Sequence, residues 1–309
     1  MDHRAQSSPS PKSGPPYWQI NLKRKFAPRV IAVTSGSGGV GKSCIVVNLG
    51  LALTQMGQKV LILDADLSLA NIDVFLGLTT HHTLIDVFAG NKSLAEVIVT
   101  GPGGLKVLPG APASAEFSEL SQAQKLFLLD ELDAFAEEFD FLLVDTGAGI
   151  SSNVLYFNLG AQERIVVADQ EPTSVIDAYA LIKVLATRYA EKRFKILFNK
   201  ITQPEEAQHS YDQLTKVADR FLSGSVSLEF IGFIPHDEAI PHSVSVQKAL
   251  VDISSSSPAS LAFTEIASTL IVQEPYTAMD GNIKFFWQSL NRRAADTFSP
   301  GDPHASQLR

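Results

Sequence analysis

Several features are scarce in this 309-residue sequence, and each scarcity excludes a class of protein. The chain has a single cysteine, Cys44, which excludes an intrachain disulfide and any metal site built from several cysteines. No apolar run approaches the roughly 18–20 residues that span a bilayer, and residues 1–19 lack the apolar core of a secretory signal. Positive charge is in deficit: the net charge of −8 argues against non-specific nucleic-acid binding by the whole surface. We therefore expect a soluble protein, or one at most attached to a membrane surface, in a reducing compartment.

The composition divides the chain into three parts. Residues 1–28 are rich in proline and serine and bury too little apolar surface to offset the entropy of ordering, so we expect disorder there. From residue 29 to 273, apolar runs of strand type alternate with helical patterns, which predicts one α/β domain. We expect a doubly wound, mostly parallel sheet of about seven to eight strands, with helices on both faces and ligands at the carboxyl ends of the strands. The expected strands are 30–34, 59–63, 105–108, 141–145, 164–168, 195–199 and 229–234, and the expected helices are 42–56, 118–138, 151–160, 173–190 and 205–223.

Residues 274–309 form a C-terminal tail that contains one amphipathic pattern. Four apolar residues recur at i, i+3, i+4 and i+7, which predicts a helix over about 281–295. With basic residues around it, such a helix can lie in a membrane interface. It can equally dock on its own domain or on a partner, and the sequence leaves these interpretations open. The candidate membrane-binding residues are Ile283, Phe286, Trp287 and Leu290.

The most informative segment is a glycine-rich loop at residues 36–43. It fits the pattern G-x-x-x-x-G-K-[ST] and lies between a strand-like run and a helical pattern. In this geometry, backbone N–H groups and the helix N-terminus bind phosphate oxygens. We expect Lys42 to contact the β- and γ-phosphates of a nucleotide and the Ser43 hydroxyl to ligate Mg²⁺. The predicted nucleotide-binding residues of this segment are Gly36, Ser37, Gly38, Gly39, Val40, Gly41, Lys42, Ser43 and Cys44.

Acidic residues end two further strand-like runs, as expected beside a phosphate-binding loop. Asp64 is expected to hold Mg²⁺ through water, and Asp66 to orient or activate the attacking water. Asp145 follows the apolar run 141–144 and is expected in the Mg²⁺ shell, before a glycine-containing switch loop at 146–149. The catalytic candidates are therefore Asp66 and Lys42. Helix-capping acids and a plain turn at the strand end are the alternatives.

Three further residues are weaker candidates. Asn199 ends a strand-like run, and an asparagine amide can pair with both N6 and N7 of adenine. Pro235 follows the run 231–234 and is assigned to the same nucleotide site. A capping asparagine and an ordinary proline after a strand explain both residues almost as well. Cys44 is expected to pack under the loop, with a regulatory thiol as the alternative.

Together these motifs resemble the MinD/ParA group of deviant Walker A ATPases, and within it they look most like the FlhG/FleN (MinD-like) regulators of flagellar number and placement. The resemblance implies a cytoplasmic protein with an ATP- and Mg²⁺-dependent cycle. ATP-bound homodimers would attach peripherally to the inner face of the cell membrane, and hydrolysis to ADP and phosphate would release monomers. Implied partners are a FlhF-like GTPase, a flagellar C-ring protein or a flagellar transcription activator, with no direct sequence-specific nucleic-acid contact. The resemblance covers about residues 29–270 and is carried by 37–43, 63–71, 145–151, 171–183, 232–237 and 247–250.

The loop departs from the signature of this group at one position. Relatives begin K-G-G-x-G-K-[ST] with a lysine that reaches the partner's phosphates across the dimer, and here that residue is Ser37. Serine carries no charge and cannot span that gap, so we expect slow hydrolysis, weakened ATP-dependent dimerisation, or both. Another lysine or arginine can take over the role, and the sequence does not show which. A second departure is that residues 1–28 lack the Asp-Gln-Ala-like helix of relatives that stimulate FlhF.

We therefore expect an ATP-binding, MinD-like switch that regulates flagellar number or placement. One alternative is a MinD/ParA-type positioning ATPase for another cargo, such as the division site, chemotaxis or secretion machinery. The other is a nucleotide-binding scaffold that no longer hydrolyses ATP. Asp64, Asp66 and Asp145 argue against complete loss of hydrolysis, because a pure binder has no need of an acid that positions water.

Overall fold

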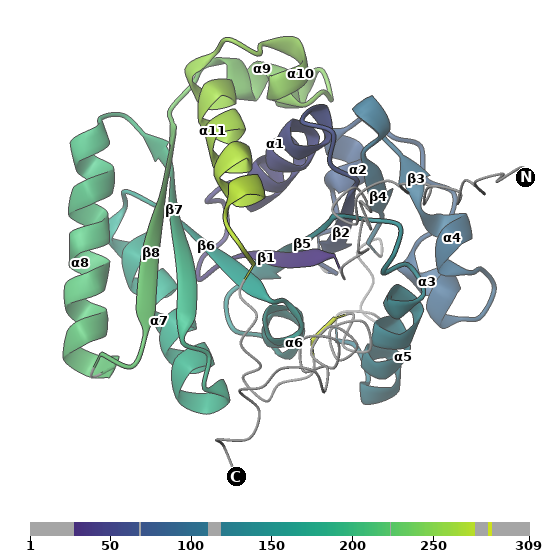
Figure 1. Cartoon of the computed structure of the whole chain (residues 1–309), viewed down its shortest axis with the longest axis horizontal. Coiled ribbons are helices and arrows are strands. Elements are labelled where there is room, and N and C mark those ends of the chain that lie inside the picture. Colours follow the sequence, from purple (N-terminus) through teal and green to yellow (C-terminus); the bar gives the residue numbers. More distant parts are fainter. Residues whose placement is uncertain (1–27, 68, 111–118, 223, 276–283, 286–309) are drawn as a thin grey trace, which may run out of the picture.

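The computed structural model describes residues 28–67, 69–110, 119–222, 224–275 and 284–285. In this part of the chain an eight-stranded sheet runs through the molecule in the order β3-β4-β2-β5-β1-β6-β7-β8 (Figure 1). Every strand except β3 runs parallel to its neighbours, and β3 pairs antiparallel with β4 at one edge. The predicted α/β fold class is confirmed. The strands are β1 (Arg29–Ser35), β2 (Val60–Ala65), β3 (Val99–Thr100), β4 (Lys106–Leu108), β5 (Phe141–Ala148), β6 (Glu163–Asp169), β7 (Arg193–Ile201) and β8 (Ser227–Pro235).

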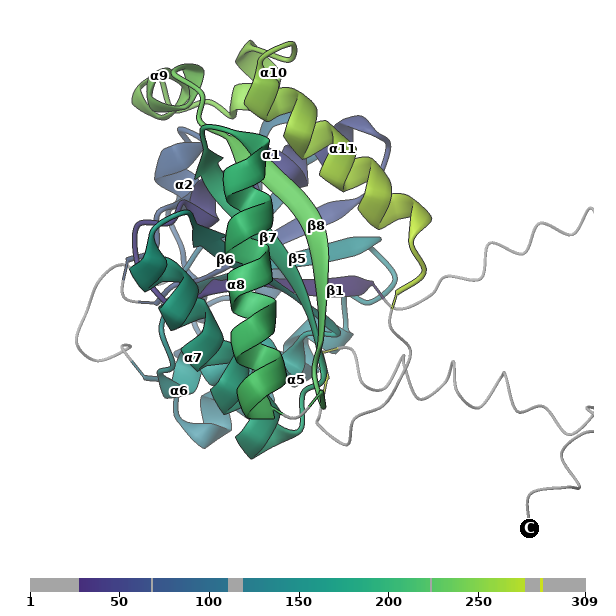
Figure 2. The ribbon, with the colours of Figure 1, turned by 90° about the vertical axis from the view of Figure 1, so that its left-hand side faces the viewer.

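Different helices cover the two faces of the sheet (Figures 1 and 2). On one face α1, α10 and α11 pack against alternate strand residues such as Ile31 and Val33. On the other face α5 and α6 pack against the intervening residues Val30 and Ala32, while α7 and α8 cover β6 and β7. Because β1 is buried on both faces, its sequence is almost continuously apolar. The longer helices are α1 (Lys42–Gln55), α5 (Gln122–Asp133), α6 (Ser152–Gly160), α7 (Pro172–Tyr189), α8 (Pro204–Leu222) and α11 (Pro258–Val272).

Apart from α11, the elements that are absent from the predicted ranges are short. They are the two-residue strand β3 and several helices of four to seven residues, which are too short to show a helical period. The predicted helix 118–138 was too long. It begins at Gln122, because the Ser121 side chain accepts a hydrogen bond from the Gln124 amide, and it ends at Asp133. The short helices are α2 (Ile72–Phe75), α3 (Leu84–Phe88), α4 (Leu94–Val97), α9 (Ala239–Ser245) and α10 (Leu250–Ile253), with a 3₁₀ turn at Pro102–Gly104.

No helix in the described ranges combines the length and the apolar character that crossing a bilayer requires.

Candidate functional site

The loop between β1 and α1 needs glycine for steric reasons. Gly39 and Gly41 have φ angles of +75° and +94°, a left-handed conformation that L side chains rarely adopt. A Cβ atom on Gly41 would lie 2.3 Å from Nδ2 of Asn199, and one on Gly36 would lie 2.0 Å from the carbonyl oxygen of Asp177. Gly41 is also the N-cap of α1 and offers no side-chain cap. The first N–H groups of α1 can therefore donate to a phosphate.

Lys42 lies beneath this loop with its ammonium group turned into the site. Its Nζ donates to Oγ of Ser35 at 2.9 Å, and that hydroxyl donates to the carbonyl oxygen of Ser37 at 2.6 Å. Burial lowers the pKa of Lys42, while the negative charges of Asp145 and Asp66 act in the opposite direction. A buried cation between two acids and a ring of backbone N–H groups is suited to the oxygens of a nucleotide phosphate.

Asp145, in the second half of β5, has a buried carboxyl group with few hydrogen-bond partners. The Ser43 hydroxyl lies close to it, but neither carboxyl oxygen makes a hydrogen bond of standard geometry. Burial raises its pKa to about 8, and the like charge of Asp64 adds to this effect, while the nearby Ser43 hydroxyl opposes it. A buried acid in this state is unfavourable unless a cation compensates it.

Asp64 lies beside Asp145, because the two residues are aligned in the parallel pairing of β2 with β5. Its carboxylate accepts N–H groups of Asn71 at 2.8 Å, Ile72 at 3.0 Å and Asp66 at 3.3 Å. Burial nevertheless raises its pKa to about 7. These three hydrogen bonds hold the Asp64 carboxylate in one orientation beside Asp145.

Ser43, Asp64 and Asp145 fit a magnesium ion. The orphaned carboxylate of Asp145, next to the Ser43 hydroxyl, is the observation that supports this fit. Magnesium keeps several waters and takes further oxygens from phosphates, so it needs few protein ligands. Consistently, no group of three or more His, Cys, Asp or Glu side chains in the described segments forms a metal cage of its own.

Asp66 faces the last residues of β5. Its Oδ1 accepts the N–H of Leu69 at 3.2 Å and lies 3.5 Å from where a Cβ on Gly147 would be. The turn that follows β5 is tied to the P-loop strand, because the Gly149 amide donates to the Ser35 carbonyl at 2.9 Å. The predicted switch loop 146–149 is therefore mostly strand, because β5 continues to Ala148. Asp66, the end of β5 and the P-loop share one edge of the sheet, and the role of Asp66 in positioning water stays a prediction.

Asn199 contacts the P-loop directly. Its Nδ2 donates to the Val40 carbonyl at 2.7 Å, and its Oδ1 accepts the backbone N–H of Lys200 at 2.9 Å. Adenine recognition by Asn199 stays a prediction, because both ends of its amide already have partners. Pro235 lies at the end of β8, in register with Ile201 of β7, on the same edge of the sheet.

Lys200 is a site residue that the sequence did not single out. Its Nζ donates to the Gly39 carbonyl of the P-loop at 2.7 Å. A lysine that follows an asparagine at a strand end is a common pattern, and it gave no signal for this contact.

Cys44 packs beneath the loop, as expected. Its side chain is buried, and burial raises its pKa to about 11. Asn48 contacts the sulfur at 3.5 Å and also donates to the Cys44 carbonyl at 2.8 Å. A thiol so far from ionisation is a poor nucleophile, which weakens the alternative of a regulatory cysteine.

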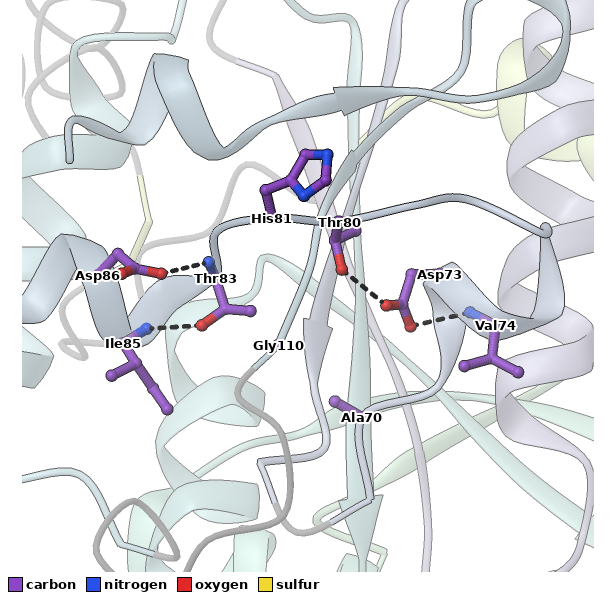
Figure 3. A pocket seen from close by; sticks show the side chains of 9 residues that line it. All are labelled: Ala70, Asp73, Val74, Thr80, His81, Thr83, Ile85, Asp86 and Gly110. Atoms are coloured by element: carbon purple, nitrogen blue, oxygen red, sulfur yellow. Dashed lines mark hydrogen bonds between the residues drawn. The ribbon is translucent and has the colours of Figure 1, made fainter.

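A separate pocket of about 550 Å³ opens beside Asp64 and contains His81 (Figure 3). Its polar groups bond to one another: Thr80 donates to Asp73 at 3.0 Å, and Asp86 accepts the Thr83 amide at 2.9 Å. These contacts cap and join short helices, so the pocket belongs to the local structure rather than to the phosphate site.

The C-terminal candidates Ile283, Phe286, Trp287 and Leu290 lie outside the described residues. The two described residues between them do not continue the expected helix 281–295: neither Lys284 nor Phe285 is helical. The reason is that the Phe285 amide donates to the Gly160 carbonyl at 2.7 Å and its ring is fully buried against α6. At these positions the tail docks on its own domain, one of the outcomes that the sequence left open.

Comparisons with known proteins identify the family to which this chain belongs. Residues 29–281 match the family described as 4Fe-4S iron sulfur cluster binding proteins, NifH/frxC family. The antiactivator FleN of Pseudomonas aeruginosa is 42% identical over 86% of this chain and 95% of its own length. The flagellum site-determining protein YlxH of Helicobacter pylori is 32% identical over 79% of this chain and 82% of its own. MinD of Pyrococcus horikoshii, solved in complex with Mg-ADP, has a TM-score of 0.66 at 26% identity and covers 79% of this chain and 96% of that structure.

The iron–sulfur cluster of the family description does not fit this chain. Such clusters are held by several cysteine thiolates, whereas this sequence has only Cys44, which is buried and has a raised pKa. The features that do fit are the P-loop, its buried lysine and the two aligned carboxylates. The chain therefore belongs to the NifH/MinD-type family of P-loop ATPases and is similar to its FleN and MinD members.

Proposed function

We propose that this protein is an ATP-binding, MinD-like switch that regulates the number or placement of flagella. The observation that carries the proposal is the buried carboxyl of Asp145 with few polar partners, which lies near Ser43 and Lys42 in a site that Mg²⁺ and a nucleotide phosphate would complete. The similarity to FleN over nearly all of that protein's length supports the flagellar role.

The residues would divide the work as follows. ATP with Mg²⁺ supplies the γ-phosphoryl group and leaves as ADP. Lys42 and the loop N–H groups bind phosphate oxygens, and Ser43, Asp64 and Asp145 hold the metal and its waters. Asp66, which follows β2 and faces the end of β5, would orient the attacking water and accept a hydrogen bond from it.

Ser37 bears on the rate of this reaction. It is half-buried in the loop, next to the exposed Gly38 and Gly39, and it carries no charge at the position of the group's signature lysine. We infer a slow ATPase with weakened ATP-dependent dimerisation. A scaffold that binds ATP without hydrolysing it is the second candidate, and Ser37 is the observation that favours it.

Partners and membrane attachment extend the proposal. We infer a homodimer as the ATP-bound form, and a FlhF-like GTPase, a C-ring protein or a flagellar transcription activator as the regulated partner. The proposed membrane contacts are Ile283, Phe286, Trp287 and Leu290. Binding of this segment to a membrane would compete with the burial of Phe285 in the domain. Co-sedimentation with anionic liposomes, with and without ATP, tests this part.

The first experiment is ATP hydrolysis by the purified protein beside Ser37→Lys, Lys42→Ala and Asp66→Ala variants. We expect slow turnover by the wild type, faster turnover by Ser37→Lys, and none by Lys42→Ala. If the wild type hydrolyses ATP no faster than the Lys42→Ala variant but still binds ADP and ATP, the result would favour the scaffold. Absence of nucleotide binding would refute both.

The cellular test is deletion of the gene, followed by counting flagella and mapping their positions by electron microscopy. We expect altered number or placement, restored by the wild-type gene and not by the Lys42→Ala variant. Normal flagella together with misplaced division sites or chemotaxis arrays would indicate a positioning ATPase for another cargo.

A further inference from the structure

Strand β7 changes its regular geometry at the point where it meets the P-loop. Phe198 is aligned with Phe233 of β8, and Ile201 with Pro235, so three steps along β7 match two along β8. This is a β-bulge, which leaves one extra residue on β7. Lys200 lies in it with a φ of +59°, a left-handed conformation that is strained for any residue with a side chain.

The bulge directs two consecutive side chains to the same loop. In a regular strand successive side chains point to opposite faces, and Leu197 and Phe198 do so, because they belong to different cores. Ile201 returns to the core that contains Phe198, although regular alternation would place residue 200 there. Between them, Asn199 donates to the Val40 carbonyl and Lys200 to the adjacent Gly39 carbonyl, both at 2.7 Å.

These two bonds fix the outer side of the P-loop. A peptide carbonyl and the N–H of the next residue point in opposite directions, so holding the Gly39 and Val40 carbonyls outward turns the N–H groups that follow them inward. Inward N–H groups are the ones that bind phosphate. The Lys200 ammonium is itself oriented by Asp169, whose Oδ2 lies 3.9 Å away.

We propose that Lys200 is a positioning residue that keeps the P-loop in its phosphate-binding conformation and thereby slows release of the bound nucleotide. The strain supports this role: glycine would adopt φ +59° without cost, yet the chain has a lysine there whose ammonium reaches the loop. The inference rests on the proposed function, because it concerns nucleotide bound at this same loop. It adds a residue, and a kinetic effect, that the loop motif does not contain.

Release of a fluorescent ADP analogue tests the inference. Full-length protein is loaded with N-methylanthraniloyl-ADP and Mg²⁺, and the dissociation rate is followed after excess unlabelled ADP is added. Because a hydrogen bond to a charged group is lost, we expect Lys200→Gly and Lys200→Ala to release the analogue about tenfold faster. Lys200→Arg should retain slow release, and Lys216→Ala, which removes an exposed lysine of α8, should match the wild type.

A second readout separates positioning from folding. Lys200→Gly removes the strain together with the ammonium, so its nucleotide-free melting temperature should equal or exceed that of the wild type. Its association rate for the analogue should stay near the wild-type value, so that its weaker affinity comes from faster dissociation. The inference would be overturned if Lys200→Gly released the analogue at the wild-type rate. It would also be overturned if this substitution lowered the melting temperature equally with and without Mg-ADP. If the wild type binds the analogue no better than Lys42→Ala, the proposed function itself fails and this inference with it.

Discussion

Gly160 and Phe285 form a contact whose disruption has a calculable effect. Phe285 is fully buried, with its ring stacked on Phe157 at 6.2 Å and edge-on to Tyr156 at 5.9 Å. Lys284 beside it donates to Glu191 at 3.0 Å. A Cβ on Gly160 would lie 2.5–3.0 Å from three carbons of the Phe285 ring. Gly160→Ala should therefore expel the ring from its site.

The free energy that holds this segment is small. Burial of the phenylalanine ring contributes roughly 2–3 kcal/mol, its aromatic contacts about 1 kcal/mol and the amide bond to Gly160 about 1 kcal/mol. Ordering the two residues costs roughly 1–2 kcal/mol each. The balance lies between about 0 and 3 kcal/mol, and its midpoint of roughly 1.5 kcal/mol corresponds to about a tenfold preference for the docked segment.

Hydrogen exchange measures this preference at the amide of Phe285. We expect Gly160→Ala to speed exchange there about tenfold and to speed chymotryptic cleavage after Phe285 by a similar factor. Alanine is otherwise the better helix former, so elsewhere in α6 the substitution should be neutral or stabilising. In a Phe285→Ala background Gly160→Ala should add nothing. Unchanged exchange at Phe285 in the single variant would refute this account of the contact.

Two further predictions concern the nucleotide site. Burial and the charge of Asp64 raise the pKa of Asp145 to about 8, so its proton must leave before metal binds. Mg-ADP affinity measured by calorimetry should therefore rise between pH 6 and 8. The metal-free protein should lose stability as the pH rises from about 4 to 8, because the carboxyl of the folded protein holds its proton more tightly than that of the unfolded protein. Asp145→Asn should weaken both trends and leave only the part due to Asp64, whose pKa is raised to about 7. Equal affinity at pH 6 and 8 in the wild type would contradict the argument. Gly41→Ala should lower the free energy of unfolding by roughly 1–3 kcal/mol in a denaturant titration, because φ is +94° and Asn199 must move, whereas Gly38→Ala, which meets no atom within 4 Å, should have little effect.

The sequence predicted the parts of the fold that have strong local patterns. The apolar runs of β1 and β7 and the long helices α1, α7 and α8 are confirmed within one or two residues, and β5 begins as predicted but extends three residues further. The acids Asp64 and Asp145 could be placed side by side, because each ends a buried parallel strand and such strands end at a common edge. The short helices and β3 were not predicted, because four to seven residues carry too little periodicity.

What the sequence determined by itself is the P-loop, the order of strands and helices, and the carboxylates at the strand ends. These follow from residue type and spacing within single elements, where the backbone geometry is nearly fixed. Only the tertiary structure decided that Lys200 contacts Gly39, 161 residues away in sequence, and that Phe285 fills the space left by Gly160. Both contacts depend on details that a local pattern does not encode: one extra residue in a strand, and one missing side chain on a helix against which a distant segment packs.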